Sequence, residues 1–306
     1  MLILGCGYLG TALARQTLST GGRVGALTRN PARVAELQAM GAVPAVAADL
    51  AASAWHGRLD PASQAVINCV SPAGSGAAGY RHSFIEGAQS IAHWLEQSAA
   101  TGAAPARDLV FTSSTGVYPQ TDGEWVDETS APVASQLSQA GAVLREAEEF
   151  FLNLPRAWVR RVWILRLAGL YGPGRHHLLD ALCAGEKIFP GGGGHWVNLL
   201  YLDDAVRAIQ ACLQAPPEIA GGVFNVADDE PVLKHDLVGW LAAQAGRNPA
   251  EIRFDEQQLS RRAHRLGSTG KVPHRKISAA KFRKMLIWHP LSHSYREGYG
   301  RIGARG

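Results

Sequence analysis

Short apolar runs alternate with longer segments of helical periodicity over the first two thirds of the chain. The apolar runs predict strands and the periodic segments predict helices. The predicted strands cover residues 2–4, 23–27, 43–47, 65–70, 108–113, 159–167, 197–202 and 223–227, and the predicted helices cover 9–20, 32–40, 81–99, 138–153 and 203–214. Because strands that alternate with helices build βαβ units, this order predicts a parallel sheet covered by helices on both faces.

The pattern loosens after residue 171. Four consecutive glycines occupy 191–194, a helix is predicted over 232–245, and a basic segment and an aromatic-rich tail follow. A run of glycines indicates a mobile loop or a close approach of the backbone to a neighbour. We therefore expect one domain from residues 1–170 with 195–227, and a smaller part from residues 171–194 with 228–306.

The composition is typical of a soluble globular protein, with 46% hydrophobic and 18% charged residues among 306. It excludes the disordered, collagen-like and coiled-coil classes. No apolar run approaches the ~20 residues that cross a bilayer, and the first residues lack the basic region and cleavage site of a signal peptide. The four cysteines are scattered, which favours reduced thiols over a disulfide or a metal site. We expect a cytoplasmic protein without a membrane partner.

The 30 basic and 26 acidic residues give a net charge of +4, and the basic excess is concentrated between residues 261 and 284. No interleaved pattern of aromatic residues accompanies the basic ones. A solvated face, or contact with an anionic small molecule, is therefore favoured over nucleic-acid binding.

Residues 5–10 are Gly-Cys-Gly-Tyr-Leu-Gly, a Gly-x-Gly-x-x-Gly motif between a predicted strand and a predicted helix. The first glycine of such a motif allows a tight turn, the second lets the backbone approach a pyrophosphate, and the third packs the helix against the strand. The helix N-terminus adds partial positive charge at the phosphates. The motif predicts a Rossmann-type, doubly wound α/β fold that binds a dinucleotide through Gly5, Gly7, Tyr8, Leu9 and Gly10. The smaller C-terminal part is then expected to bind the substrate.

The second predicted strand is followed by residues that favour NADP over NAD. An NAD site is expected to place Asp or Glu about twenty residues after the glycines, where it binds the ribose 2′-hydroxyl. This chain has Thr28 and Arg29 there, and Arg33 one helical turn later. Arginine suits a 2′-phosphate through charge-assisted, bidentate hydrogen bonds. The alternative is that both arginines lie on the surface and bind no ligand.

Several further segments make the chain similar to a known family. The segments are Ala-Asp-Leu at 48–50, Phe-Thr-Ser-Ser-Thr-Gly-Val-Tyr at 111–118, Leu-Arg-Leu-Ala-Gly-Leu-Tyr-Gly-Pro-Gly at 165–174, Asn-Leu-Leu-Tyr-Leu-Asp-Asp at 198–204 and Phe-Asn-Val at 224–226. In this order they resemble the extended, or atypical, short-chain dehydrogenase/reductases, the NAD(P)-dependent epimerase/dehydratase family. Within that family the chain most resembles a short bacterial branch of YeeZ-like proteins.

The resemblance implies roles for individual residues. Asp49 and Leu50 match a pair that contacts adenine, and Ser114 matches the Ser or Thr that orients the substrate oxygen. We add Ser71 and Ser113 to the cofactor-binding set. Arg166 joins that set because a charged side chain in an apolar strand needs a partner, either a ligand phosphate or an internal carboxylate.

The family's Tyr-x-x-x-Lys pair, which moves the proton and holds the nicotinamide ribose, is missing from its expected window. Residues 132–146 contain neither Tyr nor Lys. If Glu146 matches the acidic residue that follows the lysine by one turn, Ser138 stands at the tyrosine position and Ala142 at the lysine position. Neither replaces a tuned phenol or an ammonium, so we expect the usual proton relay to be absent.

Two residues remain as catalytic candidates, Ser114 and Tyr118, each with a structural alternative. Ser114 caps the turn that follows its strand, and Tyr118 packs at the strand end. No metal is expected, because the adjacent His176 and His177 lack a third ligand at a suitable spacing. His195 is assigned to the substrate cleft or to packing within its glycine-rich loop.

Taken together, the sequence predicts an NADP(H)-binding protein that resembles oxidoreductases or epimerases of the short-chain dehydrogenase/reductase group. Its expected partner is a small molecule such as a sugar nucleotide or another anionic metabolite. The alternative, favoured by the missing Tyr and Lys, is a non-catalytic dinucleotide-binding protein that acts as a redox sensor or regulator.

Overall fold

The computed structural model describes residues 1–303 apart from 63, 75, 131–136 and 259–271. Its centre is a seven-stranded sheet in the order β12-β7-β5-β4-β1-β2-β3, and every neighbouring pair is parallel. The strands are β1 (Leu2–Leu4), β2 (Gly25–Thr28), β3 (Ala45–Ala47), β4 (Ala65–Asn68), β5 (Ala106–Ser114), β7 (Val159–Leu167) and β12 (Gly221–Val226). The chain builds outward in one direction from β1 and then in the other from β4, which confirms the predicted doubly wound Rossmann-type fold.

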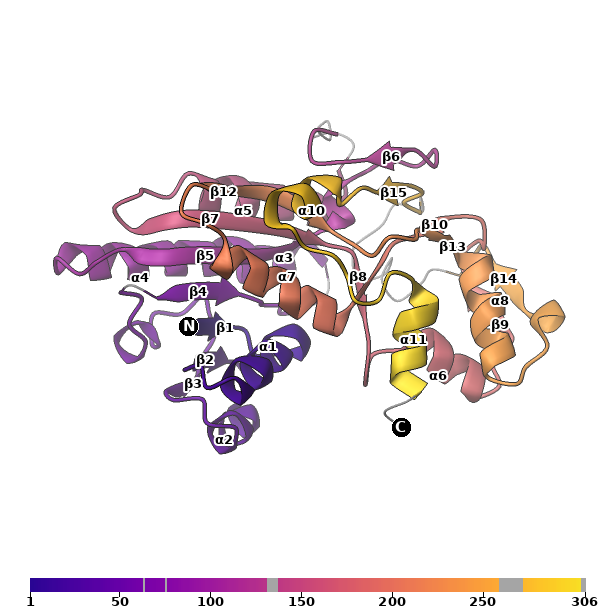
Figure 1. Cartoon of the computed structure of the whole chain (residues 1–306), viewed down its shortest axis with the longest axis horizontal. Coiled ribbons are helices and arrows are strands. Elements are labelled where there is room, and N and C mark those ends of the chain that lie inside the picture. Colours follow the sequence, from indigo (N-terminus) through magenta and orange to yellow (C-terminus); the bar gives the residue numbers. More distant parts are fainter. Residues whose placement is uncertain (63, 75, 131–136, 259–271, 304–306) are drawn as a thin grey trace.

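Helices cover both faces of this sheet (Figure 1). They are α1 (Tyr8–Ser19), α2 (Pro31–Ala39), α3 (Gly76–Arg81), α4 (Gly87–Ala100), α5 (Gln139–Leu152) and α7 (Leu202–Gln214). α1 contacts α7 on one face, and α5 contacts α3 and α4 on the other. A local signal sets the start of α2, where Asn30 accepts a hydrogen bond from the Ala32 N–H and Pro31 occupies the first turn.

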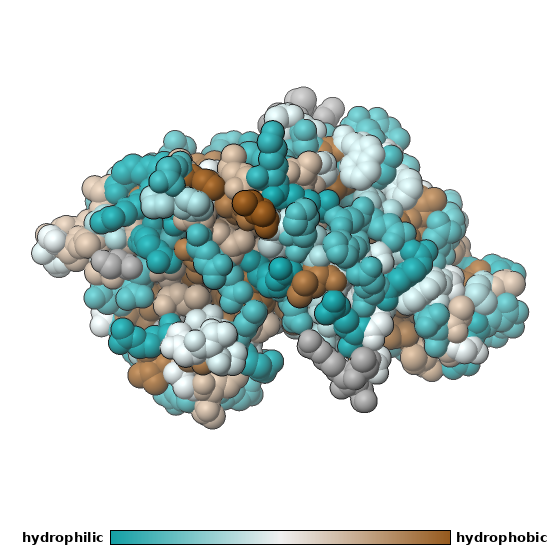
Figure 2. Space-filling view, viewed as in Figure 1, coloured by the Kyte–Doolittle hydropathy of each residue, from teal (hydrophilic) through white to brown (hydrophobic). Residues whose placement is uncertain are grey.

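A second, smaller core lies beside the carboxyl edge of the sheet (right of Figure 1). Its main buried side chains are Tyr171, Leu182, Leu237, Leu241, Tyr295 and Tyr299. It is built from α6 (His177–Cys183), α8 (Lys234–Gln244), α11 (Tyr295–Gly303) and three two-stranded pairs, namely β8 (Gly169–Tyr171) with β11 (Leu199–Tyr201), β9 (Ile188–Pro190) with β14 (Arg253–Asp255), and β10 (Trp196–Val197) with β13 (Val232–Leu233). Figure 2 shows that the surface seen from the same side is mostly hydrophilic, with apolar residues scattered over it.

The C-terminal tail has more structure than the sequence pattern predicts. β15 (Lys276–Ile277) pairs with β6 (Trp125–Val126), and α10 (Ala280–Leu286) packs against β12. Phe282 and Trp288 are buried in the core of the central sheet, whereas Tyr295 and Tyr299 are buried in the second core. Large aromatic residues therefore anchor the tail in both cores. Its helical segments are too short for their periodicity to be predicted from the sequence.

Two predicted helices also differ in detail. The predicted helix 81–99 begins earlier, at Gly76, and is interrupted by a π-helical turn at His82–Glu86. The predicted helix 232–245 starts as a strand, because Val232 and Leu233 pair with Val197 and Trp196 before α8 begins.

Among the described residues, no helix is long and apolar enough to cross a membrane.

Ile287 provides a test of backbone strain. It ends α10 in the left-handed conformation, with φ at 49°, and its side chain is 87% exposed. This conformation costs an L-residue about 1–2 kcal/mol. Replacement by glycine removes that cost, but the greater entropy of glycine in the unfolded state takes back about 0.5–1 kcal/mol. We expect Ile287→Gly to raise the free energy of unfolding by about 0.5–1 kcal/mol in urea titrations. The control Ile188→Gly, at an exposed strand position, should lower it, and a loss in Ile287→Gly would contradict the argument.

Candidate functional site

A pocket lies at the carboxyl ends of β1, β2, β3 and β4, where the order of the sheet reverses. Ligands of open α/β sheets bind at such a switch point. Eight of the predicted cofactor-binding residues line it, namely Gly5, Gly7, Thr28, Arg29, Arg33, Asp49, Leu50 and Ser71. The fold therefore gathers into one pocket residues that are up to 66 positions apart in the chain.

The glycine loop has the geometry that a pyrophosphate requires. A Cβ on Gly5, whose φ is +98°, would lie 2.7 Å from the backbone nitrogen of Val70, and one on Gly10 would lie 2.4 Å from the carbonyl oxygen of Gly5. By contrast, a Cβ on Gly7 would have no neighbour within 4 Å among the described residues. The loop thus packs tightly on two sides and stays open at Gly7, next to the first N–H groups of α1. These features fit a dinucleotide pyrophosphate.

The two other residues of this motif that were predicted to bind the cofactor, Leu9 and Tyr8, have different surroundings. The side chain of Leu9 is buried in the main core, so a contact of this residue with a phosphate would have to come from its backbone N–H. The ring of Tyr8 lies beneath the guanidinium of Arg175, with 5.3 Å between the Arg175 Cζ and the ring centroid.

The edge of the pocket after β2 is basic. Arg33 forms an exposed ion pair with Glu36, with 3.1 Å between Nη1 and Oε2. Arg29 has no carboxylate within 4 Å of its guanidinium among the described residues. A guanidinium that forms no ion pair at this edge is suited to an anionic group such as a phosphate.

Asp49, after β3, is held by two hydrogen bonds to its Oδ1. The Ala51 N–H donates at 2.9 Å, and Nε2 of His82 lies at 3.1 Å. Partial burial acts to raise the pKa of Asp49, but the bonds from Ala51 and His82 outweigh it and hold the pKa below its usual range. The sequence analysis missed His82, because no motif signals the π-helical turn that brings it to Asp49.

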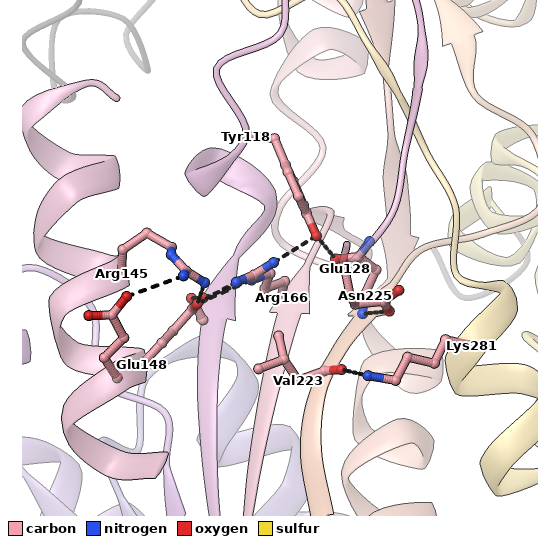
Figure 3. Close-up of polar contacts among 10 residues, drawn as sticks. Tyr118, Glu128, Arg145, Glu148, Arg166, Val223, Asn225 and Lys281 are labelled. Atoms are coloured by element: carbon pink, nitrogen blue, oxygen red, sulfur yellow. Dashed lines mark hydrogen bonds and ion pairs between the residues drawn. The ribbon is translucent and has the colours of Figure 1, made fainter. Parts of the chain in front are cut away.

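Arg166 and Ser113 are not in the pocket, which corrects their assignment to the cofactor-binding set. Arg166 is 2% exposed, and its Nη2 and Nε lie 2.7 Å and 3.0 Å from the two carboxylate oxygens of Glu148. The Ser113 hydroxyl donates to Oε1 of the same carboxylate at 2.6 Å. Figure 3 shows Glu148 reaching from α5 to Arg166 on β7. The partner of Arg166 is thus the internal carboxylate, the second of the two partners that the sequence analysis left open.

Tyr118 belongs to the same buried network. Its hydroxyl donates to Oδ1 of Asn225 at 2.8 Å and accepts from Nη1 of Arg166 at 2.8 Å (Figure 3). Burial raises the pKa of Tyr118, while Arg166 and Asn225 act in the opposite direction. This phenol is 1% exposed, and both its donor and its acceptor are engaged by neighbouring side chains.

Ser114 is half-buried, and its Oγ accepts a hydrogen bond from the Gly116 N–H at 3.1 Å. This is the turn-capping contact of the structural alternative. Because the hydroxyl acts only as the acceptor in that bond, its proton is still able to donate to a ligand oxygen. The capping role is therefore compatible with the orienting role.

The window of the missing pair is described from Leu137 onward, and 132–136 lie outside the described residues. Ser138 caps α5 by accepting from the Gly141 N–H at 3.1 Å, and Ala142 is exposed. Glu146 is exposed and pairs with Arg81, whereas Glu148 is the acidic residue of α5 that reaches the sheet. Counting from Glu148 moves the two positions to Ala140 and Leu144, so either alignment leaves neither a phenol nor an ammonium there.

The predicted candidates also include three histidines outside the pocket, His176, His177 and His195. His176 contacts Asp180 at 2.7 Å, and His177 is exposed. Burial, with Lys234 and His274 nearby, lowers the pKa of His195 to about 4. Among the described residues, no group of three His, Cys, Asp or Glu side chains could hold a metal ion.

The basic segment 261–284 is only partly described, since 261–271 lie outside the described residues. In its remainder, Lys276 stacks over Trp125 and Trp196, Lys281 donates to the Val223 carbonyl, and Arg283 pairs with Asp229. These side chains bind neighbouring elements of the fold.

The fold and the pocket define a doubly wound dinucleotide-binding protein, and comparisons with known proteins agree. The chain belongs to the NAD dependent epimerase/dehydratase family, whose model matches residues 1–227. It is 38% identical over 145 residues to Protein YeeZ of Escherichia coli strain K12, which covers 47% of this chain and 48% of that protein. The match thus spans about half the length of that relative.

Two further proteins are similar over a larger part of the chain. A 3-diazoavenalumate denitrifying reductase from a Streptomyces species is 27% identical over 226 residues, or 70% of this chain and 69% of that protein. The structure of MoeE5 in complex with UDP-glucuronic acid and NAD superposes with a TM-score of 0.79 at 20% identity, covering 99% of both chains. At this identity the superposition shows the fold.

The buried network can be tested by removing one partner. Arg166→Met leaves the buried Glu148 carboxylate with Arg145 and the Ser113 hydroxyl as its remaining partners, so we expect a loss of about 3 kcal/mol in the free energy of unfolding. The matched control is Arg81→Met, which breaks the half-exposed pair with Glu146 and should cost less than about 1 kcal/mol. Equal losses in urea titrations of the two variants would contradict the role assigned to Arg166.

Proposed function

We propose that the protein is an NADP(H)-binding member of its family, similar to the oxidoreductases and epimerases of the short-chain dehydrogenase/reductase group. The observation that carries the cofactor choice is Arg29, a guanidinium at the ribose edge of the pocket without a carboxylate partner among the described residues. No Asp or Glu follows β2 directly to accept a bond from a ribose 2′-hydroxyl. A 2′-phosphate would instead pair with Arg29 and the nearby Arg33.

The remaining cofactor contacts follow from the pocket. The backbone at Gly7 and the first turn of α1 would hold the pyrophosphate, Asp49 and Leu50 would contact the adenine, and Ser71 would lie beside the dinucleotide after β4. The nicotinamide, when bound, supplies or accepts the hydride. Ser114 is placed at the carboxyl end of β5, where its hydroxyl can orient a substrate oxygen.

The substrate is proposed to be a small anionic metabolite, of which a sugar nucleotide is one example. Support comes from the fold shared with MoeE5, which was solved with UDP-glucuronic acid, and from reductases among the relatives. All four cysteines are free, which suits a reducing compartment such as the cytoplasm.

A second candidate function is favoured by the buried position of Tyr118 and the two hydrogen bonds of its hydroxyl. With that hydroxyl held by Arg166 and Asn225, and with no Tyr or Lys in the window 132–146, the chain lacks a tuned proton donor at the expected place. A non-catalytic protein that binds NADP(H) and reports the redox state would use the same pocket. The two candidates share the cofactor and differ in whether hydride transfer follows.

Cofactor preference is the test of the proposal. A ligand at 100 times its Kd stabilises the folded state by about 2.7 kcal/mol, so thermal melts in the presence of NADPH should show a larger rise in Tm than those with NADH at equal concentration. We expect Arg29→Asp to reverse or abolish this difference, because the new carboxylate repels a 2′-phosphate and accepts from a 2′-hydroxyl. Equal shifts for both cofactors, unchanged in Arg29→Asp, would contradict the proposal.

Gly7→Val is the control for the location of the site. Since a Cβ on Gly7 meets nothing within 4 Å among the described residues, the variant should still fold. Its branched side chain would occupy the space of the pyrophosphate and remove the response to both cofactors.

A further inference from the structure

His82 bridges two carboxylates at the edge of the pocket. Its Nε2 lies 3.1 Å from Oδ1 of Asp49, and its Nδ1 lies 2.7 Å from Oε2 of Glu86. It opens the π-helical turn His82–Glu86, and the next residue, Ser83, lines the pocket. π-helical turns inside helices are frequent at functional sites.

The bridge fixes the number of protons on the ring. A neutral imidazole has one N–H and one acceptor nitrogen, whereas an imidazolium has two N–H donors. The Asp49 and Glu86 oxygens can only accept, because both are carboxylates. Both contacts therefore exist together only when the imidazole is doubly protonated, and loss of one proton places a nitrogen lone pair against one of the carboxylates.

Asp49 is the member of the bridge that belongs to the pocket. The Ala51 N–H and His82 both use its Oδ1, and Oδ2 accepts no hydrogen bond from any described residue. A fixed carboxylate with one open oxygen suits a donor such as the exocyclic amino group of adenine. The imidazolium also adds positive charge at the entry of a polyanionic ligand.

We propose that His82 is a positioning residue that holds Asp49 for the adenine amino group, so that the affinity for an adenine dinucleotide depends on the protonation of His82. This inference rests on the proposed function, because it concerns the same cofactor pocket. It adds a residue outside the glycine loop and the ribose edge, and it couples cofactor binding to pH.

The charges around His82 determine the direction of the effect. Glu86 first, and then Asp49, raise the pKa of His82 above its usual range. Arg29 faces Asp49 across the pocket, and Arg81, which precedes His82, is paired with Glu146 of α5 at 2.8 Å. The bridge is therefore retained to a higher pH than an unperturbed imidazole would allow. Affinity should fall as the pH rises through the elevated pKa of His82.

The test is a pH series of NADPH titrations with the full-length protein and its His82→Gln variant. Taking the ratio of the two affinities at each pH cancels the titration of the cofactor's own 2′-phosphate. We expect the wild-type advantage over His82→Gln to shrink about fivefold between pH 5.5 and pH 8.5, the size of a partly exposed charged contact. A parallel series with reduced nicotinamide mononucleotide, which has no adenine, should show a constant ratio.

Two results would overturn the inference. One is an NADPH affinity ratio that is constant across the pH range, and the other is an equal pH dependence for the mononucleotide. Glu86→Gln is the matched variant, since it leaves one carboxylate that a neutral imidazole can satisfy and should retain tight binding at pH 8.5. If the wild-type protein binds no NADPH at any pH, the proposed function itself fails, which separates the two failures.

Discussion

The reversal of strand order between β1 and β4 is the constraint on which the site depends. Because the helices after these two strands turn to opposite faces of the sheet, the strand ends between them are left uncovered. The loops after β1, β2, β3 and β4 then meet in one pocket, although they are far apart in the chain. Tight packing at Gly5 and Gly10 fixes the loop after β1, and the open side of Gly7 faces the pocket.

The neighbouring half of the carboxyl edge is organised differently. At the ends of β5, β7 and β12 the polar side chains face one another in a closed network in which Glu148, Arg166, Tyr118 and Asn225 satisfy each other's hydrogen bonds. A buried ion pair of this kind is costly to break and contributes more to a defined arrangement than to net stability. The molecule therefore has an open half with two arginines at its edge, which suits an anionic cofactor, and a closed half in which the Tyr118 hydroxyl is bound by Arg166 and Asn225. Ser114 lies at the boundary between them.

Most of the sheet and the glycine loop could be predicted from the sequence, because their signals are local. Strand β7 was predicted with its observed ends, and Gly5, Gly7, Arg29 and Asp49 were predicted to share a site. The errors concern long-range partners. Arg166 was included in the cofactor-binding set with its partner left open between a ligand phosphate and an internal carboxylate, because sequence spacing does not reveal that Glu148 supplies the anion. His82 was missed because no sequence motif marks the π-helical turn that brings it to Asp49.

The most direct test of the account is a crystal structure of the protein grown with NADPH. The account predicts density for the pyrophosphate against the backbone of Gly7, the 2′-phosphate beside Arg29, and the Arg166–Glu148 pair unchanged from the arrangement described above. A dinucleotide bound elsewhere, or a 2′-phosphate turned away from Arg29, would contradict it.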